Sequence, residues 1–351
     1  MNIIQNHPLL ISAEILSLIS AIDEFKGAWT ARSPLAPDRL KRLRSVALTE
    51  AVAASQRLEG LPLTAQAVNQ LLPRIALRAL NHRDEQAAAG YADALTLINA
   101  QWATLGITGY HLKELHRSLY AHSDKDHWHR GKYKISATQA MPSEQEGQQY
   151  GISFESASAF EAPRLMTQLF SWIATERERK QLHPLLLIAL FIIVFLDISP
   201  FQQGNGRLSH LLTTLLLLQA GYSHVSLIPL ESIFERDAKN YYQARQKTQQ
   251  SLRHGKPDWY PWILFFLTSI QRISPLLTAK LDREKRVSTQ LPKHALAMLE
   301  HVEAHGRLTM AGAIVLTTAS RNTLKQQLRH LVESGQLMRH GQGRSAWYSL
   351  P

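Results

Sequence analysis

The residues with the clearest chemical potential stand in one short stretch, Gly204-Asn205-Gly206-Arg207. Two glycines let the backbone approach a bound group closely, and a helix that starts near Gly206 would present unpaired N–H groups and the positive end of its dipole. The guanidinium of Arg207 has the forked donor geometry that suits phosphate oxygens. The stretch therefore predicts a site for a phosphate-bearing anion. The competing interpretation is a turn with a helix cap, which binds nothing and serves packing alone.

The elements on either side of this stretch would be two core helices. The apolar run from Leu185 to Leu196 predicts a buried helix and is too short to span a bilayer. A second apolar helix is expected from Arg207 to Gln219. The predicted anion site is thus the loop that joins them.

Composition limits the class of protein. The chain has 351 residues, of which 45% are hydrophobic and 19% charged, and this is typical of a globular main domain with at least one appended module. It has no cysteine, which excludes disulfides, zinc-thiolate sites and cysteine nucleophiles. Its start lacks the pattern of a signal peptide, so we expect a cytoplasmic protein with no membrane segment. The net charge of +11 favours a polyanionic partner, although a basic surface without a partner is the alternative.

Helical patterns dominate, and we expect a mainly α protein. Apolar residues recur at helical spacing over residues 38–60, 64–80, 82–105, 111–120, 163–179, 184–197, 207–219, 240–254 and 259–280. The exception is residues 131–154, where two alternating segments around a polar loop predict a β-hairpin, or flap. We expect a helical region over 1–100, a core over 101–270, a linker helix over 271–290 and a separate unit over 291–351.

The stretch from Ser199 to His210 resembles the motif HPFx(D/E)GNGRxxR of the Fic family, whose members usually move AMP from ATP onto a hydroxyl of a target protein. The likeness extends over roughly Val46 to Leu267. It implies an all-helical Fic core with a β-hairpin flap, a nucleotide ligand and a target protein as partners. The nucleotide contacts that it implies are Phe201, Gln203, Gly204, Asn205, Gly206, Arg207, His210 and, beside the adenine pocket, Tyr242.

Three positions depart from the family motif, and each departure weakens an ionic role. Ser199 stands where the family has a catalytic base, and a serine cannot take a proton at neutral pH. Gln203 replaces the acidic residue that holds Mg²⁺, so metal affinity should fall. His210 replaces a second arginine and is mostly neutral at pH 7. We expect weak ATP binding, no dedicated metal site and impaired AMP transfer, with an active adenylyltransferase as the alternative.

An inhibitory helix is implied by a second likeness. Residues 55–60 resemble the (S/T)xxxE(G/N) segment of some Fic proteins, and the spacing puts Ser55 and Glu59 one turn apart on a helix face. With His210 opposite Glu59, pairing would depend on pH. The histidine-rich residues 122–132 show no helical pattern, and we expect a solvated loop rather than a metal site formed by His122, Asp124, Asp126, His127 and His129.

The last 61 residues predict a winged helix-turn-helix. Three helical patterns are followed by two short strands around a basic loop, and the segment carries seven Lys or Arg against three Glu. Docking on DNA would use the exposed cations of the third helix and the wing, namely Arg321, Lys325, Arg329 and Arg344. The alternative is a module for homodimerisation or partner docking.

Overall fold

The structure of the chain is a computed structural model, which describes residues 9–32, 35–75, 80, 82–123, 125–135, 154–290, 292–341, 343 and 346–349. It is mainly helical, as expected, and its strands are confined to the C-terminal segment of the described residues. The chain folds as two compact units, one holding residues Leu43–Ser274 together with the N-terminal helix, the other holding Ala36–Arg42 and the chain from Pro275 onward.

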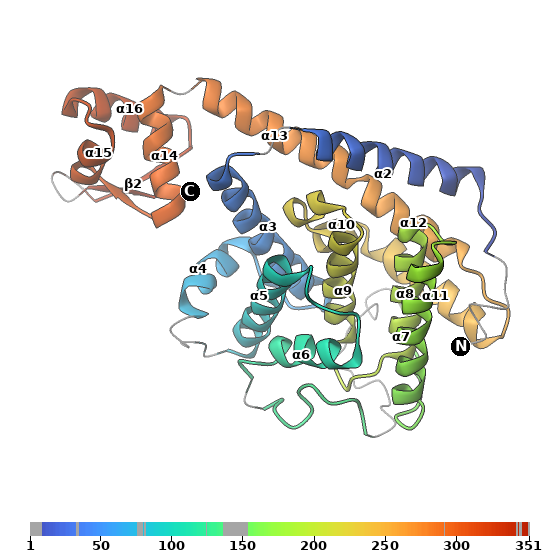
Figure 1. Cartoon of the computed structure of the whole chain (residues 1–351). Coiled ribbons are helices and arrows are strands. Elements are labelled where there is room, and N and C mark those ends of the chain that lie inside the picture. The colour runs from blue at the N-terminus through green and yellow to red at the C-terminus, as the bar shows by residue number, and fades with distance from the viewer. Residues whose placement is uncertain are drawn as a thin grey trace. The chain divides into compact units, whose positions relative to one another are not determined.

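The larger unit is built from helices throughout (Figure 1). They are α2 (Ala13–Ala31), α3 (Pro37–Leu58), α4 (Ala65–Ile75), α5 (Arg83–Gln101), α6 (Gly109–Leu119), α7 (Ala162–Arg179), α8 (Pro184–Ile198), α9 (Asn205–Gln219), the 3₁₀ turn η2 (Ser223–Leu227), α10 (Leu230–Arg236), α11 (Ala238–Arg253) and α12 (Tyr260–Gln271).

At its centre lies α8, which is apolar on every side and therefore buried on every side. It starts at Pro184, a residue suited to the first helical position because its missing N–H would be unsatisfied there in any case. The helices α7, α9, α11 and α12 pack around it. From α12, the indole of Trp262 donates a hydrogen bond of 2.8 Å to the carbonyl of Ala189. This packing fixes both helices that carry the glycine loop.

The smaller unit combines helices with a three-stranded sheet. Its elements are α13 (Ile273–Gln290), α14 (Lys293–His305), β1 (Leu308–Thr309), α15 (Met310–Thr317), α16 (Arg321–Glu333), β2 (Met338–His340) and β3 (Trp347–Ser349). The strands lie in the order β1-β3-β2 and pair antiparallel, with Leu308 opposite Tyr348 and Arg339 opposite Tyr348. Leucines of α16 close a small core of their own.

Some elements differ from the sequence expectation. The pattern over 259–280 is two helices, because α12 ends at Gln271 and α13 begins at Ile273. The helix α10 was not expected, and α2 lies in the expected helical region without having been assigned as a separate helix. The tip of the predicted flap lies outside the described residues, while Tyr133 at its start forms an antiparallel bridge with Phe201.

Length and composition alone would let one helical stretch, Tyr260–Arg283, cross a membrane. Of the 18 most apolar consecutive residues in this stretch, 44% are buried in the protein. The core helix of a soluble protein can have the same length and composition. The expectation of a cytoplasmic protein stays a prediction.

Candidate functional site

The position that the family resemblance assigns to a base is the C-terminal cap of α8. Ser199 has left-handed backbone angles (φ 42°, ψ 67°), and its N–H bonds the carbonyl of Phe195 at 2.9 Å. Its hydroxyl donates a hydrogen bond of 2.7 Å to the carbonyl of Leu196. The side chain therefore ends the helix, and it offers no group that accepts a proton near neutral pH.

Local contacts hold the glycine loop in shape. The Asn205 amide bonds both the N–H and the carbonyl of Phe201, at 3.0 and 2.9 Å. Gly204 has φ 80°, and a Cβ there would lie 2.9 Å from the hydroxyl oxygen of Tyr120. Any other residue at 204 would meet both backbone strain and a steric clash. Asn205 thus fixes the shape of the loop, and Gly204 leaves room for Tyr120 to lie close to its backbone.

A buried histidine outside the motif also supports this loop. The ring of His116 stacks on Phe201 with centroids 3.9 Å apart, and its Nε2 lies 3.0 Å from the carbonyl oxygen of Gln203. Its Nδ1 accepts a 2.9 Å hydrogen bond from the N–H of Gly131. Burial lowers the pKa of His116 to about 3, so the ring is neutral at physiological pH with its proton on Nε2. His116 is a positioning residue for the loop.

Arg207 is held by an acidic residue of α3. Its Nε lies 2.8 Å from Oε2 of Glu59, and the two side chains are only 8% and 16% exposed. On its other side the guanidinium donates to the hydroxyl of Tyr120 at 3.0 Å and lies over that ring. Glu59 therefore forms an ion pair with Arg207, a partner that was not expected from the sequence. This pair does not depend on a titrating histidine, because arginine stays charged.

The end of α3 that presents Glu59 is anchored at several points. Arg57 makes a two-pronged ion pair with Glu235 of α10, at 2.5 and 2.7 Å, and donates to the carbonyl of Leu63 at 2.8 Å. The hydroxyl of Tyr242 donates to the carbonyl of Leu58 at 2.8 Å. These contacts fix the helix end and, with it, the carboxylate of Glu59.

A buried acidic pair lies against the same helix. The hydroxyl of Tyr91 donates to Oε1 of Glu231 at 2.5 Å, and burial raises the pKa of both groups. The charge of Glu59 contributes to the raised pKa of Tyr91, which places that carboxylate nearby. Ser55, one turn before Glu59, is completely buried. The face of α3 that carries Ser55 and Glu59 is therefore an interior face.

Several residues that the resemblance assigned to the nucleotide are covered by protein. Phe201 and Tyr242 are each 1% exposed. His210 is 5% exposed, with its Nε2 3.4 Å from the hydroxyl oxygen of Tyr241. The hydroxyl of Tyr242 is committed to Leu58. These three side chains hold helices together in the present arrangement.

A cavity of about 270 Å³ opens beside the glycine loop. From the predicted site it is lined by Gln203, Gly204, Arg207 and Glu59. Arg83 and other polar residues of α5 and of the turn after α6 complete the wall. The glycine loop and the ion pair between Arg207 and Glu59 thus line the same cavity. An anion bound at the loop would occupy this cavity.

The histidine-rich segment is solvated in part, with Lys125, His127 and Trp128 exposed, while other residues of the segment are packed. Asp126 and His129 are 7% and 4% exposed, because they turn toward Tyr120 and the cavity wall. The hydroxyl of Ser123 donates to Asp126 at 2.6 Å, and burial lowers the pKa of His129. Asp124 lies outside the described residues.

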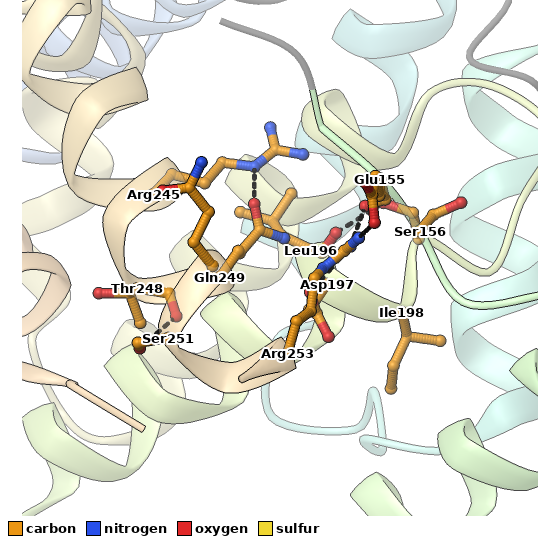
Figure 2. A network of polar contacts seen from close by, with 12 residues as sticks. Glu155, Ser156, Leu196, Asp197, Ile198, Arg245, Thr248, Gln249, Ser251 and Arg253 are labelled. Carbon is orange, nitrogen blue, oxygen red and sulfur yellow. Dashed lines mark hydrogen bonds and ion pairs between the residues drawn. The ribbon is translucent and has the colours of Figure 1, made fainter. Parts of the chain in front are cut away.

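The ends of the flap are tied to the residues just before Ser199. Figure 2 shows Arg253 reaching both Asp197, at 3.3 Å, and Glu155. Burial raises the pKa of Asp197, and Arg253 offsets part of that rise. At the other end, the N–H of Lys134 donates to the carbonyl of Pro200 at 2.9 Å. The motif loop therefore has protein contacts on the flap side as well.

The donor set fits a phosphate better than a divalent cation. Backbone donors at the start of α9 and the guanidinium of Arg207 suit an anion. Gln203 supplies only a neutral side chain, and the described residues contain no group of three His, Asp or Glu placed to hold a metal. The loop residues and Arg207 therefore suit an anion, while Glu59, Asp84 and Asp126 place three carboxylates in the wall of the same cavity.

Comparison with known proteins agrees with this geometry. A sequence model described as the Fic/DOC family matches residues 106–217, which run from before α6 into α9. Residues 106–217 are a Fic/DOC domain. The match includes the glycine loop and its two flanking helices.

Relatives and solved structures extend the likeness beyond this domain. "Protein adenylyltransferase Fic" of Drosophila virilis is 26% identical over 305 residues, or 84% of this chain and 58% of that protein. The Drosophila mojavensis protein of the same name is 29% identical over 213 residues, or 60% of this chain and 39% of the relative. The chain thus spans 39% to 58% of the length of these relatives.

Two crystal structures share the fold. A Fic family protein from Desulfovibrio desulfuricans covers 98% of both chains with a TM-score of 0.61 at 20% identity. A Fic domain containing signaling protein from Bacteroides thetaiotaomicron covers 75% of this chain and 96% of its own, with a TM-score of 0.55 at 23% identity. The Fic/DOC domain therefore sits in a chain whose helical architecture occurs in other Fic proteins.

Sequence reasoning missed the supports of the loop. His116 and Tyr120 stand four residues apart on α6, a spacing that puts both on one helix face. A histidine and a tyrosine on the inner face of a helix before the motif were the available signal. The contact between Arg57 and Glu235 joins segments 178 residues apart, for which the sequence holds no signal.

The cations predicted to meet DNA are on the surface of α16. Arg321, Lys325 and Arg329 are exposed, and Arg329 pairs with Glu333 at 2.8 Å. Arg344 lies outside the described residues. Arg321, Lys325 and Arg329 follow one another at i, i+4 spacing and share one face of the helix, beside the face that carries its buried leucines.

Proposed function

We propose that this chain is a Fic-domain protein that binds a nucleotide weakly and is impaired in AMP transfer. The nucleotide part rests on the cavity beside the glycine loop, where Gly204 permits close approach and Arg207 supplies a forked cation. ATP, when bound, would supply the AMP group. The residues that would hold its phosphates are Gly204, Asn205, Gly206 and Arg207.

The single observation that carries the impairment is the hydroxyl of Ser199 in a hydrogen bond to Leu196. AMP transfer needs a group that removes the proton of the target hydroxyl, and a positioned base contributes about 10²- to 10⁴-fold to such a rate. Ser199 holds its own proton, and the histidines near the loop are buried in packing contacts. The chain therefore lacks the base that a Fic transferase uses at this position.

A second part of the proposal is that Glu59 holds the site closed. Its carboxylate neutralises Arg207, the cation that an incoming phosphate would contact. Phosphate binding then requires this ion pair to break, because the two anions compete for one guanidinium. The anchors at Arg57 and Tyr242 keep the competitor in place. Weak binding follows from this competition.

Calorimetry with ATP tests the binding claim. Wild-type protein should bind with low affinity, and Arg207→Ala should abolish binding because the forked contact to phosphate is gone. Arg83→Ala, on the opposite wall of the same cavity, is the matched control and should weaken binding less. Equal affinities for wild type and Arg207→Ala would contradict the proposed site.

The alternative function is an active protein adenylyltransferase. The names of the Drosophila relatives favour it, since both are protein adenylyltransferases. An active enzyme would have to activate the target hydroxyl without a base at position 199. Labelling of lysate proteins by the wild-type chain with α-labelled ATP would establish this alternative.

We also propose that the smaller unit is a winged helix-turn-helix that docks on DNA through α16. Its order of elements, helix, strand, two helices and a two-stranded ribbon, is that of a winged helix. The exposed row of Arg321, Lys325 and Arg329 supplies cations on the helix that such domains place in the major groove. A dimerisation module is the competing role.

A further inference from the structure

A second cavity lies at the far ends of α8 and α9, away from the glycine loop. It has a volume of about 910 Å³ and is lined by the ends of α5, α7, α8 and α9. Each of the two central helices has 15 residues, which corresponds to about 22 Å. No residue lines both this cavity and the smaller one beside the loop. It is therefore a separate site.

The walls of this distal cavity are mostly apolar. Leu182, Leu187 and Leu216 contribute aliphatic surface, and Trp102 stands at the rim with 39% of its surface exposed. Its volume lies in the range of cavities that hold small organic ligands. A ligand with an apolar body would gain binding free energy here, because its apolar surface would be removed from water.

One side chain organises the polar part of the cavity. The amide nitrogen of Gln219 donates to the carbonyls of Trp102 and Leu105, at 3.0 and 2.6 Å. Its amide oxygen accepts a 3.0 Å hydrogen bond from Nη2 of Arg177. Gln219 thus ties the ends of α5, α7 and α9 together and sets the direction of the guanidinium. Such support is what a binding site needs in order to be ready before its ligand arrives.

Arg177 has no acidic partner among the residues that the structure describes. The neighbouring Glu176 pairs with Arg179, at 3.4 Å. Arg177 is exposed, so its guanidinium can be reached by a ligand in the cavity. Lys180 ends α7 and lines the same cavity. Arg177 and Lys180 therefore stand beside an apolar wall, and the carboxylate of Glu176, which also lines the cavity, is paired with Arg179.

We propose that the distal cavity binds a small amphipathic anion, with an apolar body against Trp102 and Leu187 and a carboxylate or phosphate group on Arg177 and Lys180. This site is independent of the glycine loop and of the nucleotide proposed to bind there. A small molecule fits this site, since the apolar surface lines a cavity and the two cations stand three residues apart at the end of α7.

Octanoate and octanol, used as probes on the full chain, separate charge from apolar contact. Calorimetry should show saturable binding of octanoate with a dissociation constant below about 1 mM and at least tenfold weaker binding of octanol, because one charge-assisted contact is worth about tenfold or more. Arg177→Gln should weaken octanoate about tenfold and leave octanol unchanged. Arg164→Gln, an exposed arginine elsewhere on α7, should change neither.

A second variant tests the location without touching a charge. Ala103 is exposed at the rim, so Ala103→Trp fills the groove without disturbing the core, and it should abolish binding of both probes while the thermal unfolding midpoint stays the same. Equal binding of octanol and octanoate, or binding that neither variant changes, would overturn the proposal. A wild-type dimer that Ala103→Trp converts to a monomer in sedimentation would overturn it as well, since the groove would then be an interface between copies.

Discussion

At the residue scale, the pair of Arg207 with Glu59 sets nucleotide affinity. Glu59→Gln removes the competing charge and should tighten ATP binding by about tenfold or more, because a charge-assisted contact is worth roughly 1.5–3 kcal/mol. Glu50→Gln, more than two turns earlier on α3, is the matched control and should have little effect. Calorimetry measures both. An unchanged affinity in Glu59→Gln would show that this carboxylate does not compete with the nucleotide.

His116 gives a second prediction at this scale, on stability. Its pKa is lowered to about 3 in the folded protein, whereas an unfolded chain titrates it near its usual value of about 6.5. The unfolded state therefore binds the extra proton first, and this contribution to stability is complete above about 6.5 and is lost as pH falls toward 3. Between pH 7 and 5 the loss from this residue should be about 2 kcal/mol.

Urea unfolding of wild type and His116→Gln at both pH values measures that loss. The wild type should lose more free energy of unfolding on acidification than the variant, whatever the stability of each at pH 7. Parallel losses in the two proteins would mean that His116 is not a neutral support of the loop.

At the element scale, the end of α3 is the part that must move for a phosphate to reach Arg207. Arg57→Gln removes the ion pair with Glu235, and Tyr242→Phe removes the bond to the carbonyl of Leu58. Each should speed backbone hydrogen exchange at residues 55–60 several-fold, because local opening governs exchange there. Arg74→Gln, which breaks a comparable pair with Glu85, should leave residues 55–60 unaffected. The same rate of hydrogen exchange at residues 55–60 in all three variants would contradict the anchoring role.

The helix α16 gives the second prediction at this scale. Each cation that contacts a phosphate adds about 0.9 to the slope of log K against log salt for duplex DNA. Replacing Arg321 and Lys325 with alanine should therefore weaken binding and flatten that slope by up to about two. Fluorescence anisotropy with the full chain at several salt concentrations measures this. Salt-independent binding, or an unchanged slope in the double variant, would favour the dimerisation role.

At the scale of the whole molecule, the sequence predicts the helices better than the side-chain contacts between them. The apolar run of α8 and the glycines after it predict the central helices and their loop, because burial on all sides and positive φ leave clear marks in a sequence. Figure 1 shows these helices at the centre of the larger unit. The ion pair between Glu59 and Arg207 was not predictable, since the distance from α3 to each motif residue depends on how several other helices pack.

The same limit applies to residues whose role is set by tertiary contacts. The bond of Tyr242 to a helix end had no signal in the sequence, and His116 had no motif to mark it. The hydrophobic pattern also predicted a single helix over α12 and α13. The break between them is one polar residue, Arg272, which does not interrupt the pattern. Local rules describe each helix, whereas the site arises from their packing.

We infer that three substitutions in the motif, and not the fold, block AMP transfer. The most direct measurement is incubation with α-labelled ATP and Mg²⁺ of three proteins: wild type, Ser199→His with Gln203→Glu and His210→Arg, and that triple variant with Glu59→Gly added. We predict no label on the wild type or on lysate proteins, detectable self-labelling in the triple variant and stronger labelling once Glu59 is gone, an increase of at least about 100-fold for the restored base. Strong labelling by the wild type, at the level of the repaired variants, would contradict that inference.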